Sequence, residues 1–400
     1  MDVDVVRAVN DLTTRWAREL PAGNDRSGGA GKESNTVVSG LGLWPLLAIL
    51  ATAADEPGRA ELAAAAGLPA DQGSAQALAL IQAIDGSADL HAALAVWVSE
   101  HLKLAESFDS VLPAPLVGML TGKSAVDKPK LDAWAAEHTN DLIREMPLEI
   151  TPDVMLVLAS ALSLRTTWVR PFTEQIKRVH DGPWSGGSWH WLERVDNDLD
   201  AVRRYDDDLT VITVRGDADV DVLLGVGSGG QADVLTGLLA AAARPADGVP
   251  GSQLIDQGQP GTQLAPGVKV GQTTGLRQDL KLTLPAFNVE AEHDLLALRE
   301  LFGLSAVTTD PGEHGHFSAI SPTPLAVGQA RQKVLARFYA TGFEAAAVTS
   351  MALMRTSMPT RQARRLEVAL DQPFAFAAVL RESRLPIVAG WVATPTEPGA

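Results

Sequence analysis

The spacing of apolar residues predicts several helices in the first third of the chain. Apolar side chains recur every three or four positions near the N-terminus and predict an amphipathic helix there: Val5, Val9, Leu12, Trp16 and Leu20. Apolar segments of helical length predict three more helices, over residues 43–53, 61–68 and 75–84. Gly67 stands near the end of the second of these, where a helix C-cap is expected.

Two further helices are predicted later in the chain. Residues 131–146, LDAWAAEHTNDLIREM, have a marked amphipathic pattern. One side of such a helix carries Leu131, Trp134, Ala135, His138, Leu142 and Met146. The second helix is predicted over residues 294–302.

Strand patterns are most frequent in the last third. Residues 154–164, VMLVLASALSL, are too apolar for a surface element and predict a central strand covered on both faces. Residues 209–214 and 220–225 flank Gly216-Asp217 and predict a hairpin. Further strands are predicted over residues 36–39, 90–99, 280–287, 333–339, 373–379 and 386–392. Helices first and strands later indicate the α+β class.

One segment has little pattern of either kind. Residues 244–277 are rich in glycine, proline and glutamine, which predicts an insertion or a mobile loop.

Composition narrows the possible functions. The chain has 400 residues, of which 46% are hydrophobic, enough for a large core in one or two domains. An excess of 49 acidic over 33 basic residues argues against nucleic-acid binding. No apolar run approaches the ~18 residues of a membrane span. The N-terminus lacks the pattern of a secretory signal. A cytoplasmic location is therefore expected, or an extracellular one if the numbering begins after processing.

Motifs for catalysis, metals or cofactors are weak. Cysteine is absent, which excludes thiolate metal sites and cysteine nucleophiles. GGAGKES resembles a phosphate-binding loop, but Glu33 follows Lys32 where a serine or threonine is needed. The HGH segment at His314 to His316 lacks a third ligand at suitable spacing. We therefore expect neither an enzyme, nor a bound metal, nor a cofactor.

The stretch GFEAAAVTSMALMRTSMPT, residues 342–360, follows no regular pattern. Its alanines favour helix, whereas Val348 and Thr349 favour strand. From Ala345 to Leu366 there is no acidic residue, yet four arginines occur: Arg355, Arg361, Arg364 and Arg365. An unpaired, basic segment of this kind predicts an exposed loop handled by another protein. The alternative is a tolerated surface loop.

Several segments, taken in order, resemble the serpins, a family of conformational protease inhibitors. The resembling segments are residues 35–54, 61–68, 131–143, 156–172, 282–295, 316–321, 366–376 and 390–395. Among them are a W-x-x-x-x-T-N pattern at Trp134, Thr139 and Asn140, an L-P-x-F strand, and F-S-x-I-S at residues 317–321. Residues 173–280 diverge from the family and contain the insertion.

The resemblance implies a fold and an activity. It implies a single serpin domain over residues 1–400, with three β-sheets, about eight or nine helices and an exposed reactive-centre loop. It also implies an inhibitor of a serine protease, possessing a hinge and reactive loop at residues 339–366. Cleavage of that loop traps the protease in a 1:1 covalent complex while the loop inserts into the main sheet. The expected partner is a trypsin- or subtilisin-like protease, and the inhibitor itself is expected to be a monomer.

The resemblance places the hinge at the start of the irregular stretch. The hinge residues are Gly342, Phe343, Glu344, Ala345, Ala346, Ala347, Val348 and Thr349. Small side chains at alternate positions suit a segment that becomes a strand. Phe343 departs from the small residue of inhibitory relatives, and we expect it to overpack the sheet and slow insertion. Replacing Phe343 with threonine should then increase the trapped fraction.

The cleaved bond has several candidates. Family spacing places it fourteen residues after Gly342, between Thr356 and Ser357. A count back from Glu367 gives Gln362-Ala363 instead, and Arg355 or Arg361 would suit a trypsin-like protease. Arg361 to Arg365, RQARR, also resembles a dibasic processing site.

The resemblance assigns a sheet-opening region to Ser39, Ser160, Trp168 and Gln332. Ser160 and Gln332 replace the asparagine and histidine of the family, and a serine–glutamine pairing is expected in their place. This reduced polar cluster, together with Phe343, leaves open a non-inhibitory serpin that acts as a binding or carrier protein.

Overall fold

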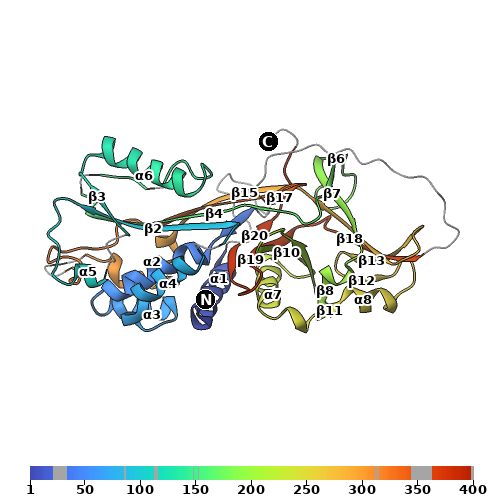
Figure 1. The fold of residues 1–400 in the computed structure, drawn as a ribbon, viewed down its shortest axis with the longest axis horizontal. Helices are drawn as coiled ribbons and strands as arrows, with labels where there is room; N and C mark the ends of the chain where they lie inside the picture. The colour runs from blue at the N-terminus through green and yellow to red at the C-terminus, as the bar shows by residue number, and fades with distance from the viewer. Residues whose placement is uncertain are drawn as a thin grey trace. The chain divides into compact units, whose positions relative to one another are not determined.

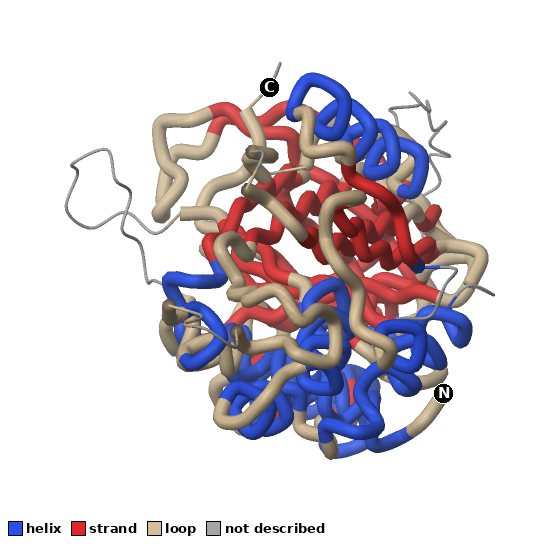
Figure 2. Tube along the Cα trace, turned by 90° about the vertical axis from the view of Figure 1, so that its left-hand side faces the viewer, coloured by secondary structure: helices blue, strands red, loops and turns tan. Residues whose placement is uncertain are grey.

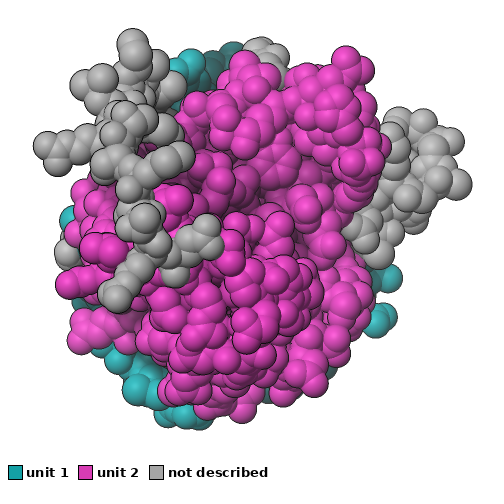
Figure 3. All heavy atoms as spheres, turned by 90° about the vertical axis from the view of Figure 1, so that its right-hand side faces the viewer, with its two compact units in different colours: residues 1–16, 39–164, 291–334 teal, residues 17–38, 165–290, 335–400 magenta. Residues whose placement is uncertain are grey.

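The structure is a computed structural model. It describes residues 1–20, 34–84, 87–111, 116–146, 148–151, 153–310, 312, 315–343 and 363–397. The chain forms two compact units that are interleaved in sequence (Figure 3). The first comprises Met1–Trp16, Ser39–Leu164 and Ala291–Val334, and the second Ala17–Val38, Arg165–Glu290 and Leu335–Ala400.

The helices of the first unit follow the apolar spacing of the sequence. They are α1 (Val3–Glu19, whose last turn belongs to the second unit), α2 (Gly40–Ala53), α3 (Gly58–Ala66), α4 (Gly73–Ile84), α5 (Phe108–Val111) and α6 (Ser124–His138). The apolar positions that predicted α1 are all buried. Gly67 ends α3 in the left-handed conformation, with φ 69°, as its C-cap position predicted. Within the described ranges, no helix is long and apolar enough to cross a bilayer.

A small sheet forms the middle layer of the first unit. Its strands lie in the order β3 (Val117–Leu120), β2 (Leu90–Ser99) and β4 (Leu156–Leu164). α2 and α4 contact one face, and α6 covers the other (Figures 1 and 2). The predicted strand forms over Leu156–Leu164 and is covered on both faces. The prediction of a central position was wrong, because β4 lies at the edge of this three-stranded sheet among the described residues.

The prediction for residues 131–146 was wrong about the ends of the helix. α6 begins seven residues earlier, at Ser124, and ends at His138. It stops because Asn140 and Asp141 take the left-handed conformation, with φ 50° and 62°. Thr139 Oγ1 stabilises this end by donating to Ala135 O at 2.7 Å and accepting from Ile143 N at 3.0 Å.

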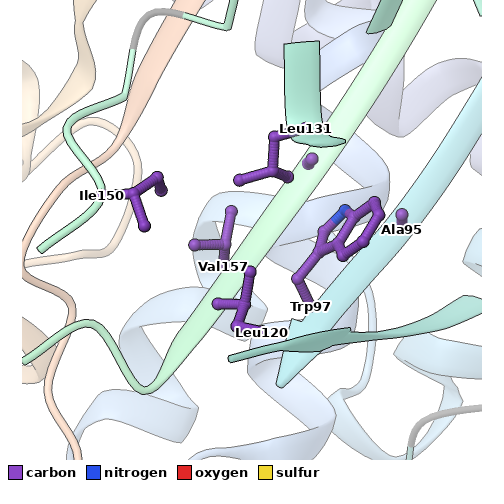
Figure 4. Packing of buried hydrophobic residues seen from close by; sticks show 7 residues of the cluster. Ala95, Trp97, Leu120, Leu131, Ile150 and Val157 are labelled. Atoms are coloured by element: carbon purple, nitrogen blue, oxygen red, sulfur yellow. The ribbon is translucent and has the colours of Figure 1, made fainter. Parts of the chain in front are cut away.

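α6 is held on the sheet by a buried apolar cluster (Figure 4). Leu131 of α6 is fully buried against side chains of β2, β3 and β4. The cluster consists of Ala95, Trp97, Leu120, Leu131, Ile150, Val157 and Ala159. Trp134 adds an edge-on contact with Trp97, at 6.4 Å between ring centroids. The family's W-x-x-x-x-T-N pattern therefore both packs this helix and ends it.

The second unit contains two larger sheets. The seven-stranded sheet has the order β1 (Thr36–Val38), β20 (Pro386–Val392), β19 (Phe374–Leu380), β10 (Val220–Gly227), β9 (Leu209–Arg215), β8 (Val202–Tyr205) and β11 (Val249–Pro250). β9 and β10 form the predicted hairpin, and α7 (Gln231–Ala243) contacts β10 and β19 (Figure 1). The six-stranded sheet has the order β12 (Gln263–Ala265), β13 (Val268–Thr273), β18 (Ala363–Ala369), β14 (Asp279–Pro285), β7 (Ser188–Asp196) and β6 (Thr173–Arg178).

A further sheet of four strands contains the start of the irregular stretch. Its order is β15 (Phe287–Asp294), β16 (Arg331–Phe338), β17 (Gly342–Phe343) and β5 (Thr166–Thr167). The strand predicted over residues 280–287 is in fact two, because β14 ends at Pro285 and β15 joins a different sheet. The helix predicted over residues 294–302 was wrong: only a short 3₁₀ turn, η6 (Leu295–Leu298), forms there.

Residues 244–277 contain short elements rather than irregular chain alone. Besides β11, β12 and β13, they form η4 (Pro245–Asp247), α8 (Gly251–Leu254) and η5 (Ile255–Gln257). Short 3₁₀ turns elsewhere are η1 (Ala70–Gln72), η3 (Leu199–Ala201) and η7 (Ala306–Thr308).

Candidate functional site

The start of the irregular stretch is already part of a sheet. Gly342 pairs with Thr167, and Phe343 pairs with Thr166 on one side and Phe338 on the other. These two residues form β17, between β16 and β5. Glycine is required at 342 because a Cβ there would lie 2.3 Å from Thr166 O. The residues assigned to the beginning of the hinge therefore already have the backbone pairing of a strand.

Phe343 lies in a buried aromatic cluster. Its side chain is only 2% exposed and lies 6.5 Å from the ring of Phe376. Phe376 contacts Phe287 at 4.8 Å, and Phe287 stacks on Phe338 at 5.3 Å. The large side chain that suggested overpacking is thus buried at one end of a connected series of aromatic rings.

Trp168 and the segment after it hold the turn that precedes β17. Trp168 Nε1 donates to Tyr339 O at 2.9 Å, and its backbone nitrogen donates to Thr341 O at 3.0 Å. Phe172 N donates to Ala340 O at 2.7 Å. The Trp168 ring also lies 4.7 Å from the ring of Phe338. The W-x-x-P-F sequence therefore fixes three successive carbonyl groups just before Gly342.

Ser39, Ser160 and Gln332 meet at the start of α2. Ser39 is the N-cap, and its hydroxyl accepts from Gly42 N at 3.0 Å. Gln332 binds the Ser39 backbone twice: its Oε1 accepts from Ser39 N at 3.0 Å, and its Nε2 donates to Ser39 O at 2.9 Å. Ser160 Oγ donates to Gly42 O at 2.5 Å. The expected serine–glutamine pairing is replaced by separate bonds from both residues to the helix start.

Replacing Gln332 with alanine should weaken this junction. The variant loses both hydrogen bonds from Gln332 to the backbone of the buried Ser39, so a loss of about 1–3 kcal/mol is expected. Urea unfolding, monitored by tryptophan fluorescence, measures the change. Gln329→Ala is the matched control, because Gln329 makes the same two kinds of bond to the backbone of exposed Glu149. Equal losses of unfolding free energy in the two variants would show that the bonds from Gln332 to Ser39 stabilise the protein no more than an exposed pair does.

The chain that follows the irregular stretch is held in β18, which begins at Ala363. Arg365 makes a bidentate ion pair with Asp279, with nitrogen–oxygen distances of 2.6 and 2.7 Å, and also donates to Thr273 Oγ1 at 3.1 Å. The hydrogen bond to Asp279 raises the pKa of Arg365. Arg364 pairs with Asp256 at 2.7 Å. The prediction of four unpaired arginines was therefore wrong for these two, which lie in a strand rather than in an open RQARR site.

The remaining assignments lie outside the described residues. This applies to the hinge from Glu344 to Thr349 (Glu344, Ala345, Ala346, Ala347, Val348 and Thr349) and to the bond candidates Arg355, Thr356, Ser357, Arg361 and Gln362. His314 of the HGH segment lies outside them as well. Among the described residues, no group of three or more histidines and carboxylates is arranged to hold a metal ion.

Sequence reasoning missed several parts of this site. The carbonyl groups of Tyr339, Ala340 and Thr341 carry no sequence signal, because any residue supplies them. The Arg365–Asp279 pair joins residues 86 positions apart and depends on the strand order of the sheet. The W-x-x-P-F motif of Trp168, Pro171 and Phe172 was the one available sequence signal for the hydrogen bonds that hold the turn before Gly342.

Comparison with solved structures identifies the fold. The chain resembles the native thermophilic serpin tengpin, with a TM-score of 0.70 at 16% identity over 98% of this chain and 95% of that one. It resembles human thyroxine-binding globulin in complex with thyroxine, with a TM-score of 0.68 at 17% identity over 99% of this chain and 100% of that one. Serpin48 of the insect Tenebrio molitor gives a TM-score of 0.68 at 17% identity, over 99% of both chains.

The sequence comparison establishes the family. The serpin (serine protease inhibitor) family model matches residues 7–181 and 268–395, well over half of the chain. The chain belongs to the serpin family. Members of this family are protease inhibitors or non-inhibitory proteins rather than enzymes.

Two curated relatives match parts of the chain. An uncharacterized serpin-like protein of Methanosarcina acetivorans is 28% identical over 124 residues, covering 29% of each protein. A serine protease inhibitor of Cyanea capillata is 30% identical over 162 residues, covering 37% of this chain and 42% of the relative. The matches thus span less than half the length of either relative.

Proposed function

We propose that this protein inhibits a serine protease as a suicide substrate. The observation that carries the proposal is the pairing of Gly342 and Phe343, the first two residues of the hinge, between β16 and β5. Insertion of the cleaved loop then amounts to extending an existing strand from residue 344 onwards. Because side chains alternate along a strand, residues 345, 347 and 349 would follow Phe343 onto the inner face. These are Ala345, Ala347 and Thr349, which are small enough to be buried there.

Inhibition depends on the order of two steps. The serine hydroxyl of the protease attacks the carbonyl carbon of the bait residue, the peptide bond breaks, and the new amino terminus leaves with the C-terminal part of the chain. The N-terminal part stays bound to the protease as an ester. Insertion that precedes hydrolysis of the ester carries the protease with it and traps the complex.

The bond we propose is Thr356–Ser357. Fourteen residues inserted at about 3.3 Å each span roughly 46 Å, the length of a long strand. Arg355 and Arg361–Gln362 are the alternatives, which a protease specific for arginine would prefer.

Incubation with trypsin-, chymotrypsin- and subtilisin-like proteases tests the proposal. The expected result is an SDS-stable 1:1 complex with at least one of them, and mass spectrometry of the released C-terminal peptide locates the bond. Chain cleaved by a non-target protease should unfold at a higher temperature than the intact chain. Cleavage of the loop with neither a complex nor a gain in thermal stability would overturn the proposal.

The alternative is a carrier protein. It is considered because the fold is similar to that of thyroxine-binding globulin, whose structure contains thyroxine. One surface hollow of about 580 Å³ lies in the second unit, beside Tyr205 and Arg244. Its walls also carry four aspartates: Asp206, Asp208, Asp233 and Asp247. Because carboxylates repel anions, this hollow does not suit an anionic cargo. The strand pairing of Gly342 and Phe343 favours the inhibitor proposal.

A further inference from the structure

The strand that follows the loop has neighbours on both sides. β18 pairs with β13 along residues 363–368 and with β14 along residues 365–369. It is the third strand of the six-stranded sheet, and β13 and β12 lie beyond it. Without this β12–β13 hairpin, β18 would be an edge strand with one row of backbone groups unpaired.

The first strand of the hairpin comes from a part of the chain that the family model does not match, whereas β13 begins where the match resumes, at residue 268. The family model leaves residues 182–267 unmatched, and β12 lies within this gap. The patternless segment 244–277 therefore supplies the two strands that cover β18. The structure thus places part of this segment beside β18, the strand that follows the loop.

Close packing joins the hairpin turn to the end of β18. Gly267 has φ 68°, in the left-handed region, and a Cβ there would lie 2.9 Å from Ala369 O. Gly267 O accepts a hydrogen bond from Ala369 N at 2.9 Å. At the other end of the strand pair, Thr273 pairs with Ala363, the first residue of β18. The hairpin therefore contacts β18 along its whole length.

Side chains fasten β18 to the same neighbours. Leu366 and Val368 are buried with Val270 and Val268 of β13. Arg365 bridges β14 and β13 through Asp279 and Thr273, and Lys269 pairs with Glu367 at 3.3 Å. Release of β18 must break contacts on both sides at once.

The loop between β17 and β18 is too short to insert fully while β18 stays in its sheet. Nineteen residues, 344–362, separate β17 from β18. If fourteen residues after Gly342 inserted without cleavage, the strand would run roughly 46 Å away from β17. The six remaining residues, 357–362, reach at most about 20 Å back. Full insertion of an uncleaved loop therefore requires β18 to leave its sheet.

We propose that the β12–β13 hairpin acts as a lock: it holds β18 in its sheet and so prevents full insertion of the loop before the loop is cleaved. The inference rests on the proposed function for the insertion step, but its tests need no covalent complex. Cleavage removes the constraint because the inserting segment is then no longer joined to β18.

Gly267→Ala tests the lock against Gly186→Ala. Both glycines have positive φ, but Gly186 lies in the turn between β6 and β7, where a Cβ would meet nothing within 4 Å. Each intact variant is incubated at a temperature below its unfolding transition. Conversion is measured as the appearance of uncleaved chain that resists subtilisin at the loop and unfolds at a higher temperature. We expect Gly267→Ala to convert at least about tenfold faster than Gly186→Ala, because it strains the turn and crowds Ala369. Equal rates, including no conversion in either variant, would overturn the lock.

Hydrogen exchange of the unaltered protein provides a second measurement. We expect the paired amides of β18 to exchange as slowly as those of β19, and at least about tenfold more slowly than those of the edge strand β6. Exchange of β18 at the rate of β6 would also contradict the lock. Failure to trap any protease, combined with slow exchange and fast conversion of Gly267→Ala, would reject the inhibitor proposal and leave the lock standing.

Discussion

Replacing Phe343 with alanine is expected to lower the free energy of unfolding by about 3–5 kcal/mol. The ring is 2% exposed and contacts Phe376 within a connected set of aromatic side chains, so its removal leaves a cavity that β17 cannot fill. Urea unfolding monitored by tryptophan fluorescence measures the effect, because Trp168 lies in the same cluster.

Leu276→Ala is the matched control for this experiment. Leu276 is also a large apolar residue, but its side chain is 78% exposed in the turn between β13 and β14. Its replacement should change stability by less than about 0.5 kcal/mol. A loss below about 1 kcal/mol in Phe343→Ala would show that the ring is not packed as described.

Burial of Phe343 also reverses the expectation drawn from its size. Threonine at this position was expected to relieve overpacking and increase the trapped fraction. In the structure the residue is already paired within the sheet, and its ring is buried beside Phe376. Phe343→Thr should therefore lose stability through the cavity it leaves, with no gain in trapped fraction. Gel densitometry of complex against cleaved chain measures the fraction.

Replacing Arg365 with methionine is expected to lower the free energy of unfolding by about 2–4 kcal/mol. Methionine keeps an unbranched apolar side chain but leaves Asp279, which is 8% exposed, without its bidentate partner. Breaking a fully buried pair costs about 3–5 kcal/mol, and the expected value is smaller because 20% of the Arg365 side chain is exposed.

Arg364→Met is the control on the same strand. Arg364 and Asp256 are 36% and 62% exposed, so the loss of their pair should cost less than about 1 kcal/mol. Equal losses of unfolding free energy in the two variants would show that the buried Arg365 pair contributes no more than the exposed Arg364 pair.

The contribution of the Arg365 pair should not decline in mild alkali. The hydrogen bond to Asp279 raises the pKa of Arg365, and a raised pKa favours the charged form in the folded state. Arginine is effectively always protonated in the unfolded chain, so the contribution of the pair is fully present below that unfolded-state pKa and is lost only as the pH rises through the still higher folded-state value. The difference between Arg365→Met and the unaltered protein should be the same at pH 7 and pH 10.

Local patterns predicted most of the elements and failed where tertiary contacts or single backbone angles decide. Apolar spacing gave α1 its buried face, and Gly67 gave the end of α3. The same reasoning extended α6 to Met146, because it could not foresee the left-handed turn at Asn140 and Asp141. Within the patternless segment 244–277, β13 forms beside β18, and a pairing partner almost 100 residues away leaves no local trace in the sequence.

The sequence by itself determined the family of this protein, because the order of its helix, strand and turn motifs is a property of the linear chain. It also determined where the irregular stretch lies and which residues in it are small. Only the tertiary structure decided what holds the two ends of that stretch. The Phe343 ring is buried because Phe376 of the distant strand β19 lies beside it, and Arg365 is paired because the sheet brings Asp279 beside it. Both depend on strand order, which is set by long-range packing rather than by local preference.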